Sequence, residues 1–253
     1  MKNSLVSVIV PCYNHGKFLE ESVRSVQESI WQPIEIIIVN DGSDDNSEEV
    51  AKKLVNRHKN VRYLYQQNAG PSVARNNGIL AANGEIILPL DADDLISPQY
   101  IEAAVKEFDK DPKLKVVYCE AEKFGTKSGN WKLDEFSPDK LAYKNMIFVS
   151  ALFKKSDWKK AGGFSEEMTW GFEDWEFWIS LLKTGGKVKK LPITGFYYRI
   201  SQNSRRKRVD NTGRKKTVDF INKKHSEFIR AQLGGPLRYQ KSLSKLINRF
   251  WKK

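Results

Sequence analysis

The chain has 253 residues, which suits one α/β domain with or without an appendage and allows folding without disulfides or a structural metal. No apolar run approaches the roughly 20 residues that span a bilayer, and residues 4–11 are too short for a signal peptide. We therefore expect a cytoplasmic protein, or one that touches a membrane only peripherally. The net charge of +12 comes from the end of the chain, because residues 199–253 hold 17 Lys/Arg and 3 Asp/Glu, against 26 and 28 before them.

Strand-like and helix-like segments alternate along the first half of the chain. Apolar, β-branched runs predict strands at residues 6–10, 35–40, 61–66, 85–90 and 115–121. Helical spacing or capping residues predict helices at 17–29, from Asp44 or Asp45 to about Arg57, within 70–82 and at 97–109. This alternation predicts an α/β fold with a Rossmann-like, mostly parallel sheet and helices on both faces. Residues 122–144 are polar and rich in turns, so we expect them to be irregular.

An acidic cluster, Asp91, Asp93 and Asp94, directly follows the strand expected at 85–90. Carboxylates this close repel one another unless a cation lies among them, and Mg²⁺ or Mn²⁺ binds one or two carboxylates together with substrate phosphates. In an extended segment Asp91 and Asp93 share a face. The alternative is an acidic cap on the following helix. The cluster alone favours neither interpretation.

Two further polar positions, Asp41 and Arg75, each allow two interpretations. Asp41 ends the strand at 35–40 and either accepts a hydrogen bond from a nucleotide base or stabilises its own turn, which the residue alone favours. Arg75 and Asn76 follow a Gly-Pro-Ser turn at 70–72 and either contact phosphate or lie on a solvated helix face. For these residues alone the solvated face is favoured.

Asp174 lies at the start of a segment rich in aromatic residues. The helical spacing of Trp175, Trp178 and Leu182 puts Asp174 in the first turn of a helix, where the helix dipole favours an ionised carboxylate. An ionised carboxylate beside aromatic walls can act as a general base toward a hydroxyl group, and Trp170 can stack on a sugar. The alternative is an acidic helix start with a Trp-rich core face.

Four motifs together resemble the family 2 glycosyltransferases, which are inverting enzymes with the glycosyltransferase A-type fold. They are Val-Ile-Val-Pro-Cys-Tyr-Asn at 8–14, Ile-Val-Asn-Asp-Gly-Ser-Asp-Asp at 38–45, Leu-Pro-Leu-Asp-Ala-Asp-Asp at 88–94 and Gly-Phe-Glu-Asp-Trp-Glu at 171–176. The similarity covers roughly residues 4–200. One such motif would be weak, whereas four in the family's order and spacing are specific.

The resemblance implies a role for each matching position. It implies a catalytic base at Asp174, a ligand for Mn²⁺ or Mg²⁺ at Asp93, and acceptor contacts at Trp170 and Glu173. The donor's nucleotide base is expected to contact Pro11, Tyr13 and Asp41. The diphosphate is expected near Arg75, and the ribose near Asp91.

The implied function is transfer of a sugar, from a UDP-sugar, to a saccharide or lipid-linked glycan acceptor in cell-surface polysaccharide or glycan synthesis. A sugar nucleotidyltransferase would need a Gly-rich loop with Arg and Lys after the first strand, whereas residues 11–17 contain only Gly16. The alternative from another class is a catalytically inactive carbohydrate-binding or scaffold protein of the same fold. The intact aspartates at 41, 91, 93 and 174 argue against it.

One position departs from the family's pattern. Many relatives carry a His shortly after the Tyr-Arg pair found here at 198–199, where this chain continues Ile-Ser-Gln-Asn. The three His residues, at 15, 58 and 225, are scattered, and none is expected to replace it. The candidates for the missing contact to metal or diphosphate are Ser201, Asn203 and Arg205.

We divide the chain into a catalytic domain, residues 1–200, and a basic helical C-terminal extension, residues 201–253. In the extension Leu243, Leu246, Ile247, Phe250 and Trp251 form an apolar stripe at helical spacing, with the basic residues largely off it. Residues 236–253 therefore either lie on an anionic membrane or dock on the core with their charges in water. Nucleic acid is not expected, because the aromatic residues do not interleave with the basic ones.

Overall fold

The computed structural model describes residues 4–201 and 210–250. Within these residues a nine-stranded sheet has the order β3-β2-β1-β4-β8-β6-β9-β5, and β7 pairs with β6. Pairing is parallel through β3-β2-β1-β4 and between β6 and β9, and antiparallel elsewhere. The strands are β1 Val6–Cys12, β2 Ile34–Asp41, β3 Val61–Gln66, β4 Ile86–Pro89, β5 Leu95–Ile96, β6 Leu114–Gly125, β7 Gly129–Trp131, β8 Leu152–Lys154 and β9 Lys187–Ile200.

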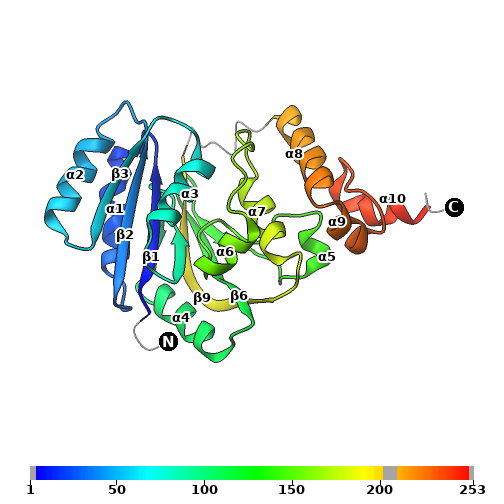
Figure 1. Cartoon of the computed structure of the whole chain (residues 1–253), viewed down its shortest axis with the longest axis horizontal. Helices are drawn as coiled ribbons and strands as arrows, with labels where there is room; N and C mark the ends of the chain where they lie inside the picture. Colours follow the sequence, from blue (N-terminus) through cyan, green and yellow to red (C-terminus); the bar gives the residue numbers. More distant parts are fainter. Residues whose placement is uncertain (1–3, 202–209, 251–253) are drawn as a thin grey trace.

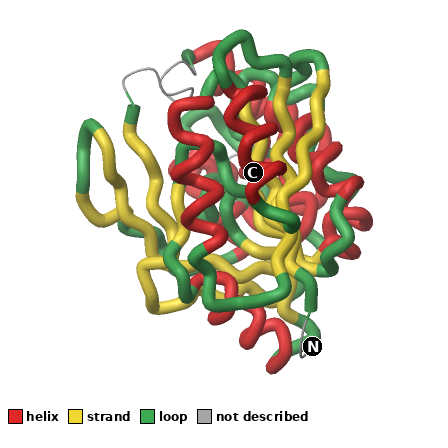
Figure 2. Tube along the Cα trace, turned by 90° about the vertical axis from the view of Figure 1, so that its left-hand side faces the viewer, coloured by secondary structure: helices red, strands yellow, loops and turns green. Residues whose placement is uncertain are grey.

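Helices cover both faces of this sheet, as Figures 1 and 2 show. The strand order places α1 and α2 on one face of β1–β3 and α3 on the other, because parallel crossovers are right-handed. The expected α/β fold with a mostly parallel sheet is thus confirmed. The helices are α1 Gly16–Gln27, α2 Ser47–Arg57, α3 Pro71–Ala81, α4 Tyr100–Lys110, α5 Pro138–Leu141, α6 Lys155–Ala161, α7 Glu173–Leu182, α8 Asn211–Lys224, α9 Ser226–Leu233, η2 Lys241–Leu243 and α10 Ser244–Phe250.

The start of α2 differs from the expectation. Asn46 is the residue before the first turn, and neither Asp44 nor Asp45 caps the helix. Asp45 instead accepts hydrogen bonds from the backbone N–H of Gly16, at 3.0 Å, and from the N–H and hydroxyl of Ser47. Its carboxylate therefore fastens the beginning of α1 to the beginning of α2, a pairing between residues 29 positions apart.

The central strands are buried along their whole length, which explains their β-branched composition. Helix α3 packs closely on them through Gly78, where an added Cβ would lie 2.4 Å from a methyl carbon of Ile9 and 3.0 Å from one of Val39. A larger residue would push the helix away from the sheet. Since Arg75 lies one turn before Gly78, this contact also fixes where Arg75 lies.

The second half of the chain was less completely predicted. Residues 122–144 were expected to be irregular, but they contain the end of β6, the short strand β7 and helix α5. Strand β9 was not predicted, although it runs for 14 residues beside β6. Its exposure alternates poorly and its first half carries Lys residues, so it lacks the continuous apolar pattern of a central strand.

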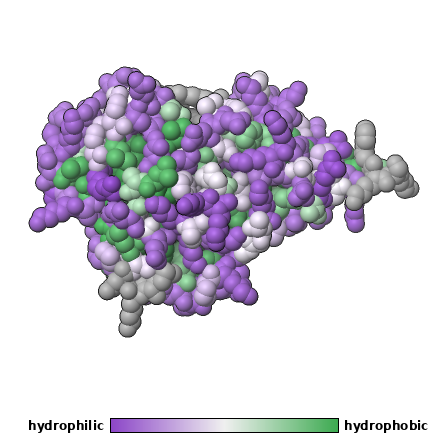
Figure 3. All heavy atoms as spheres, viewed as in Figure 1, coloured by the Kyte–Doolittle hydropathy of each residue, from purple (hydrophilic) through white to green (hydrophobic). Residues whose placement is uncertain are grey.

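The C-terminal helices α8, α9 and α10 lie at the opposite end of the molecule from α2, beside α5 and α7 (Figure 1). Hydrophilic residues cover most of the face shown in Figure 3, including the visible part of these helices. In the described part of the chain, no helix is both long and apolar enough to cross a bilayer. The expected basic helical extension is therefore present, and the division at residue 200 stays a prediction.

Candidate active site

The polar turns after β1, β2 and β4 meet at one edge of the sheet, as parallel strands require. The first two are joined directly, because Asn14 accepts a hydrogen bond from the N–H of Asp44 at 2.8 Å and donates its own N–H to Ser43 at 3.0 Å. Asn14 has a positive φ of 56°, which turns the chain sharply at this point. Before it, Pro11 is half-buried and Tyr13 is 46% exposed. An exposed ring at this edge can cover a nucleotide base.

Asp41 is buried and holds the loop that leads into α3. Its carboxylate accepts hydrogen bonds from the side chain of Gln66 at 2.8 Å and from the backbone N–H groups of Ala69 and Gly70 at 2.8 and 2.9 Å. The structural role of Asp41 is thus real, but it fastens a loop from another strand rather than its own turn. A carboxylate has about four acceptor sites, so room remains for one base N–H, and base binding stays a prediction.

Arg75 is buried, so the interpretation as a solvated helix face is wrong. Its guanidinium donates to Asp91 at 2.7 Å and to Glu173 at 3.1 Å, and thereby links α3, the end of β4 and α7. Although burial lowers the pKa of Arg75, the two carboxylates raise it above its ordinary value, so the group stays charged. Its Nε atom is buried, and none of the described residues accepts a hydrogen bond from it.

The acidic cluster does not cap a helix, because α4 begins only at Tyr100 and β5 lies between. Its three members differ in exposure: Asp91 and Asp93 have side chains that are 34% and 19% exposed, whereas Asp94 is buried. Asp94 accepts the backbone N–H of Arg199 at 2.8 Å and so fixes the end of β9. Asp91 and Asp93 remain as the carboxylates that a ligand can reach.

His15 lies beside this cluster, although no sequence pattern predicts a His at this place. Its Nδ1 atom is 3.6 Å from a carboxylate oxygen of Asp93, and its side chain is 40% exposed. Strands β1 and β4 are neighbours in the sheet, so the loops that follow them bring His15 and Asp93 together. Of the residues proposed to replace the missing His, Ser201 is half-buried, and Asn203 and Arg205 lie outside the described residues.

The chemistry of these side chains fits a divalent cation held in part by substrate. Burial raises the pKa of Asp93 and Asp94, and the neighbouring carboxylates raise it further. A cation would relieve the repulsion between these carboxylates. Carboxylate oxygens are ligands that suit Mg²⁺ and Mn²⁺. Among the described residues no group of three His, Cys, Asp or Glu side chains is arranged to hold a metal. Such a site would therefore need phosphate oxygens, which is the common arrangement for Mg²⁺.

Asp174 lies in the first turn of α7, as expected, and both of its oxygens are engaged. One accepts the backbone N–H of Trp175 at 2.8 Å, and the other accepts the side-chain amide of Asn145 at 2.7 Å. Burial raises the pKa of Asp174 to about 6, Glu173 acts in the same direction, and Asn145 and Arg75 oppose them. At pH 7 the ionised form thus prevails by about ten to one, and a carboxylate with this pKa can take a proton from a hydroxyl group.

The residues expected on the acceptor side are separated by the structure. Glu173 is buried against Arg75, on the side of the acidic cluster. Trp170 is half-buried against the extension, where its indole N–H donates to the hydroxyl of Thr217 at 3.1 Å and its ring meets Phe220 edge-on. Acceptor contacts at Glu173 and Trp170 stay predictions.

Two buried contacts behind Asp174 could not be predicted. Asn145, which orients its carboxylate, lies in the segment after α5 and has no motif to mark it. Glu176, two residues after Asp174 in α7, accepts a hydrogen bond from His225 at 2.6 Å, and both side chains are fully buried. The helix that carries Asp174 is therefore fastened from behind by the extension.

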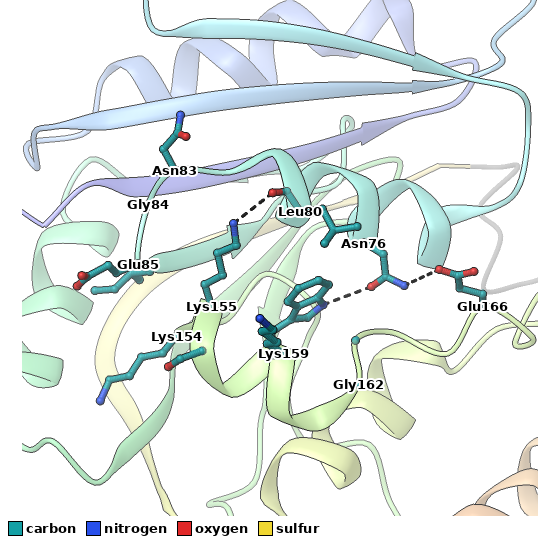
Figure 4. Close-up of a pocket in the computed structure, with 14 residues that line it drawn as sticks. Asn76, Leu80, Asn83, Gly84, Glu85, Lys154, Lys155, Lys159, Gly162 and Glu166 are labelled. Carbon is teal, nitrogen blue, oxygen red and sulfur yellow. Dashed lines mark hydrogen bonds between the residues drawn. The ribbon is translucent and has the colours of Figure 1, made fainter.

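A hollow of about 940 Å³ lies away from these residues, between α3 and the segment from β8 to the loop after α6 (Figure 4). Its polar groups largely satisfy one another: Asn76 donates to Glu166 at 3.0 Å, and Lys155 donates to the carbonyl of Leu80 at 3.2 Å. None of the predicted donor, metal or base residues lines it. The hollow therefore gives no competing candidate for the active site.

The fold and the grouping of carboxylates at the strand ends define a glycosyltransferase of the A-type fold. Residues 7–174 match the family model for glycosyl transferase family 2, and the chain belongs to this family. It is 43% identical over 117 residues to the uncharacterized glycosyltransferase YibD of Escherichia coli, covering 46% of this chain and 34% of YibD. It is 32% identical over 193 residues to the chondroitin synthase of Pasteurella multocida, covering 74% of this chain and 20% of the synthase.

Solved structures share the fold. S. aureus TarS 1–349 in complex with UDP-GlcNAc superposes with a TM-score of 0.74 at 20% identity, over 96% of this chain and 71% of that one. The mannosyltransferase PcManGT of Pyrobaculum calidifontis, in complex with GDP-Man and Mn²⁺, gives a TM-score of 0.65 at 18% identity, over 98% and 83%. The chain thus spans about a third of YibD and a fifth of the chondroitin synthase, and most of these two solved structures.

Proposed function

We propose that this chain transfers a hexosyl or N-acetylhexosaminyl group from a UDP-sugar to a saccharide or lipid-linked glycan, with inversion at the anomeric carbon. Nucleotide-sugars bound in the fold's solved neighbours, UDP-GlcNAc and GDP-Man, support the donor class. The likeness to a chondroitin synthase supports a glycan product of the cell surface. The roles proposed are donor binding by Pro11, Tyr13, Asp41, Arg75 and Asp91, metal binding by Asp93, acceptor contacts by Trp170 and Glu173, and base catalysis by Asp174.

The observation that carries this proposal is the bridge made by Arg75. It contacts Asp91, in the motif assigned to the donor, and Glu173, next to the assigned base, from positions 16 and 98 residues away. One buried cation thus sets the relative position of the donor motif and the first turn of α7. Precise placement of a nucleophile against an anomeric carbon is worth several kcal/mol of barrier, so a bridge at this point serves catalysis.

In the proposed reaction Asp174 takes the proton of the acceptor hydroxyl while that oxygen bonds to the anomeric carbon. The bond from this carbon to the diphosphate oxygen breaks in the same step, and UDP leaves with the bonding electrons. Asn145 keeps the base carboxylate oriented, and burial keeps its pKa near 6, close to the working pH. A single displacement needs no covalent intermediate with the enzyme.

A divalent cation, Mn²⁺ or Mg²⁺, would be held by Asp93, with Asp91 and His15 beside it, and by the donor's phosphates. When bound, it stabilises the negative charge of the diphosphate leaving group. PcManGT, which shares the fold, has been solved with Mn²⁺, and this supports the cofactor. Although none of the three His residues was expected to replace the missing one, we assign this contact to His15, because its Nδ1 atom is 3.6 Å from Asp93.

A panel of UDP-sugars with a coupled assay for UDP release tests the assignment. We expect metal-dependent release that falls by 10²–10⁴ in Asp174→Asn, the usual contribution of a general base, with UDP affinity unchanged. Asp93→Ala should lose both release and the Mn²⁺ dependence of UDP binding. The matched control is Asp157→Asn, in the first turn of α6, which should equal the parent.

UDP release by Asp174→Asn or by Asp93→Ala that matches the parent protein would refute the site assignment. If the parent protein releases no UDP from any UDP-sugar but still binds glycans, the inactive carbohydrate-binding protein becomes the better description. The panel also identifies the sugar that is transferred.

A second proposal concerns the last helix and an anionic membrane. The polar residues Ser244 and Asn248 form the docked face of α10, and Asn248 donates to the carbonyl of Pro236 at 2.9 Å. The apolar residues Leu243, at the end of η2, and Leu246 and Phe250, in α10, are 47%, 52% and 72% exposed. An outward apolar stripe among basic residues supports peripheral binding at the cytoplasmic face of a membrane. Trp251 lies outside the described residues.

A further inference from the structure

The aromatic residues on either side of Asp174 face a lysine of the extension. Lys241, in η2, places its Nζ atom 4.7 Å from the ring centre of Phe172 and 4.4 Å from that of Trp175. These two residues flank the predicted base along the chain. Phe172 precedes the first turn of α7 with a positive φ of 64°, which turns its side chain at the point where the helix begins. The extension therefore reaches the entrance of the catalytic helix.

A second lysine lies over the aromatic residue proposed to contact the acceptor. Lys216 of α8 has its Nζ atom 5.7 Å from the ring centre of Trp170. The same ring is fixed from α8 by the hydrogen bond to Thr217. The aromatic residues before and after Asp174 are thus each paired with a cation, and both cations come from the extension.

The environment of Lys241 leaves its charge uncompensated. In the described ranges no carboxylate oxygen lies within 4.0 Å of its Nζ atom, whereas nine other lysines are paired in this way. Lys241 is half-buried, and burial, then the nearby Arg214, lower its pKa to about 8. Aromatic rings attract a cation only modestly. A half-buried ammonium group next to another cation is therefore suited to an anionic ligand.

The position separates this charge from the donor's phosphates. The proposed donor motif reaches α7 through Glu173, whose carboxylate points to Arg75 and Asp91. Phe172 and Trp175, by contrast, contact the extension. Asp174 lies in the first turn of α7, between the side that faces the donor motif and the side that faces the extension. An acceptor that approaches Asp174 from the side of the extension therefore passes Lys241.

We propose that Lys241, assisted by Arg214 and Lys216, binds an anionic group of the acceptor, a phosphate or a carboxylate, close to the hydroxyl that Asp174 deprotonates. This inference rests on the proposed function and assigns the class of acceptor. A phosphate belongs to a lipid diphosphate or a phosphodiester glycan, and a carboxylate belongs to a uronate residue. Lys241 is a specificity residue in this scheme and does not take part in the proton transfer.

The test compares three acceptors that share one terminal sugar: a neutral oligosaccharide, one with a neighbouring uronate, and one with a neighbouring phosphate. We expect the full-length protein to prefer one anionic acceptor by at least tenfold in kcat/KM. Lys241→Met keeps the alkyl stem over the rings but removes the charge. It should abolish this preference through KM and leave the neutral acceptor within twofold, and Lys241→Arg should restore it. Lys223→Met, an exposed residue of α8, controls for the change in net charge.

Each outcome has a defined meaning. The better of the two anionic acceptors tells phosphate from carboxylate. An equal loss for neutral and anionic acceptors in Lys241→Met, or a parent protein indifferent to acceptor charge, would overturn the proposal. Acceptor-free hydrolysis of the UDP-sugar monitors the proposed function separately, because it needs the donor site but not Lys241. If hydrolysis and transfer are both absent for the parent protein, it is the proposed function that fails.

Discussion

Asp174 and Asn145 form the contact on which the pH dependence of this protein should depend. The base must be ionised to accept a proton, and it is protonated below its pKa of about 6. We therefore expect kcat/KM to be constant above about pH 7 and to fall tenfold per pH unit below about pH 6. Because the Asn145 hydrogen bond lowers this pKa, Asn145→Ala should move the falling limb to higher pH. Initial rates between pH 5 and 8, at fixed ionic strength, measure the falling limb of the parent protein and that of Asn145→Ala.

Asn56→Ala, at an exposed position of α2, is the matched control and should keep the parent's profile. A limb at the same pH in the parent and in Asn145→Ala would show that another group limits the rate.

At the scale of residues, the sequence predicted the identity of the functional side chains more completely than it predicted their contacts. Asp91, Glu173 and Asp174 were singled out by their motifs and Arg75 by the family resemblance, and the structure brings these four together. The motifs could not reveal that Arg75 is buried between two carboxylates, because its partners lie 16 and 98 residues away. The same limit applies to His15, since a single His in a loop carries no pattern that points to Asp93.

At the scale of elements, α7 is joined to the extension by a buried hydrogen bond between His225 and Glu176. Glu176 accepts hydrogen bonds from His225, Ser165 and Ser180 and contacts Lys224 at 3.0 Å. Although burial raises its pKa, these partners, His225 first, lower it to about 2. Glu176 therefore stays ionised inside the protein, and its stability contribution is present above about pH 4.5, the value for an ordinary Glu, and is lost as the pH falls toward 2.

Removing one partner of this pair should be costly. We expect His225→Ala to lower the free energy of unfolding by about 3 kcal/mol, because the change leaves a buried carboxylate without its histidine partner. Urea denaturation at pH 7 measures the loss. His58→Ala, at the half-exposed end of α2, is the control and should change stability by less than about 0.5 kcal/mol. Equal stabilities of the two variants would contradict a structural role for the pair.

Elements were predictable where local pattern and tertiary setting agree. Strands β1, β2 and β4 are almost wholly buried, so they consist of continuous apolar runs, whereas β3 lies at the edge of the sheet and is partly exposed. The ends of all four strands were predicted within about two residues. Strand β9 was missed because it pairs with β6 through a bulged register and carries Lys at its exposed positions. The short strands β5 and β7 exist only through their partners, and two or three residues cannot show a period.

At the scale of the whole molecule, the outward apolar stripe of α10 predicts binding to anionic vesicles. Replacing Leu246 and Phe250 together by Ser should weaken cosedimentation with phosphatidylserine vesicles by at least tenfold, because each side chain contributes about 1–2 kcal/mol when buried in the interface. Both residues face away from the protein, so the fold should be unaffected. The matched control replaces the exposed residues Tyr65 and Leu80, which lie far from the extension.

Unchanged sedimentation of the Leu246 and Phe250 variant would exclude this helix as the membrane contact. These point substitutions are a cleaner test than deleting residues 235–253, which would also remove Lys241 and Asn248.

The pairing of β9 with β6 has a consequence for the synthesis of the chain. Leu114 pairs with Lys187, and Gly125 with Ile200, so the partner of β6 is translated long after β6 itself. Until then one edge of β6 is open and can pair with strands of other chains. The sheet closes only once the segment that ends beside Asp94 has left the ribosome. We therefore expect folding yield to depend on chaperones more strongly than it would for a sheet built from neighbouring segments.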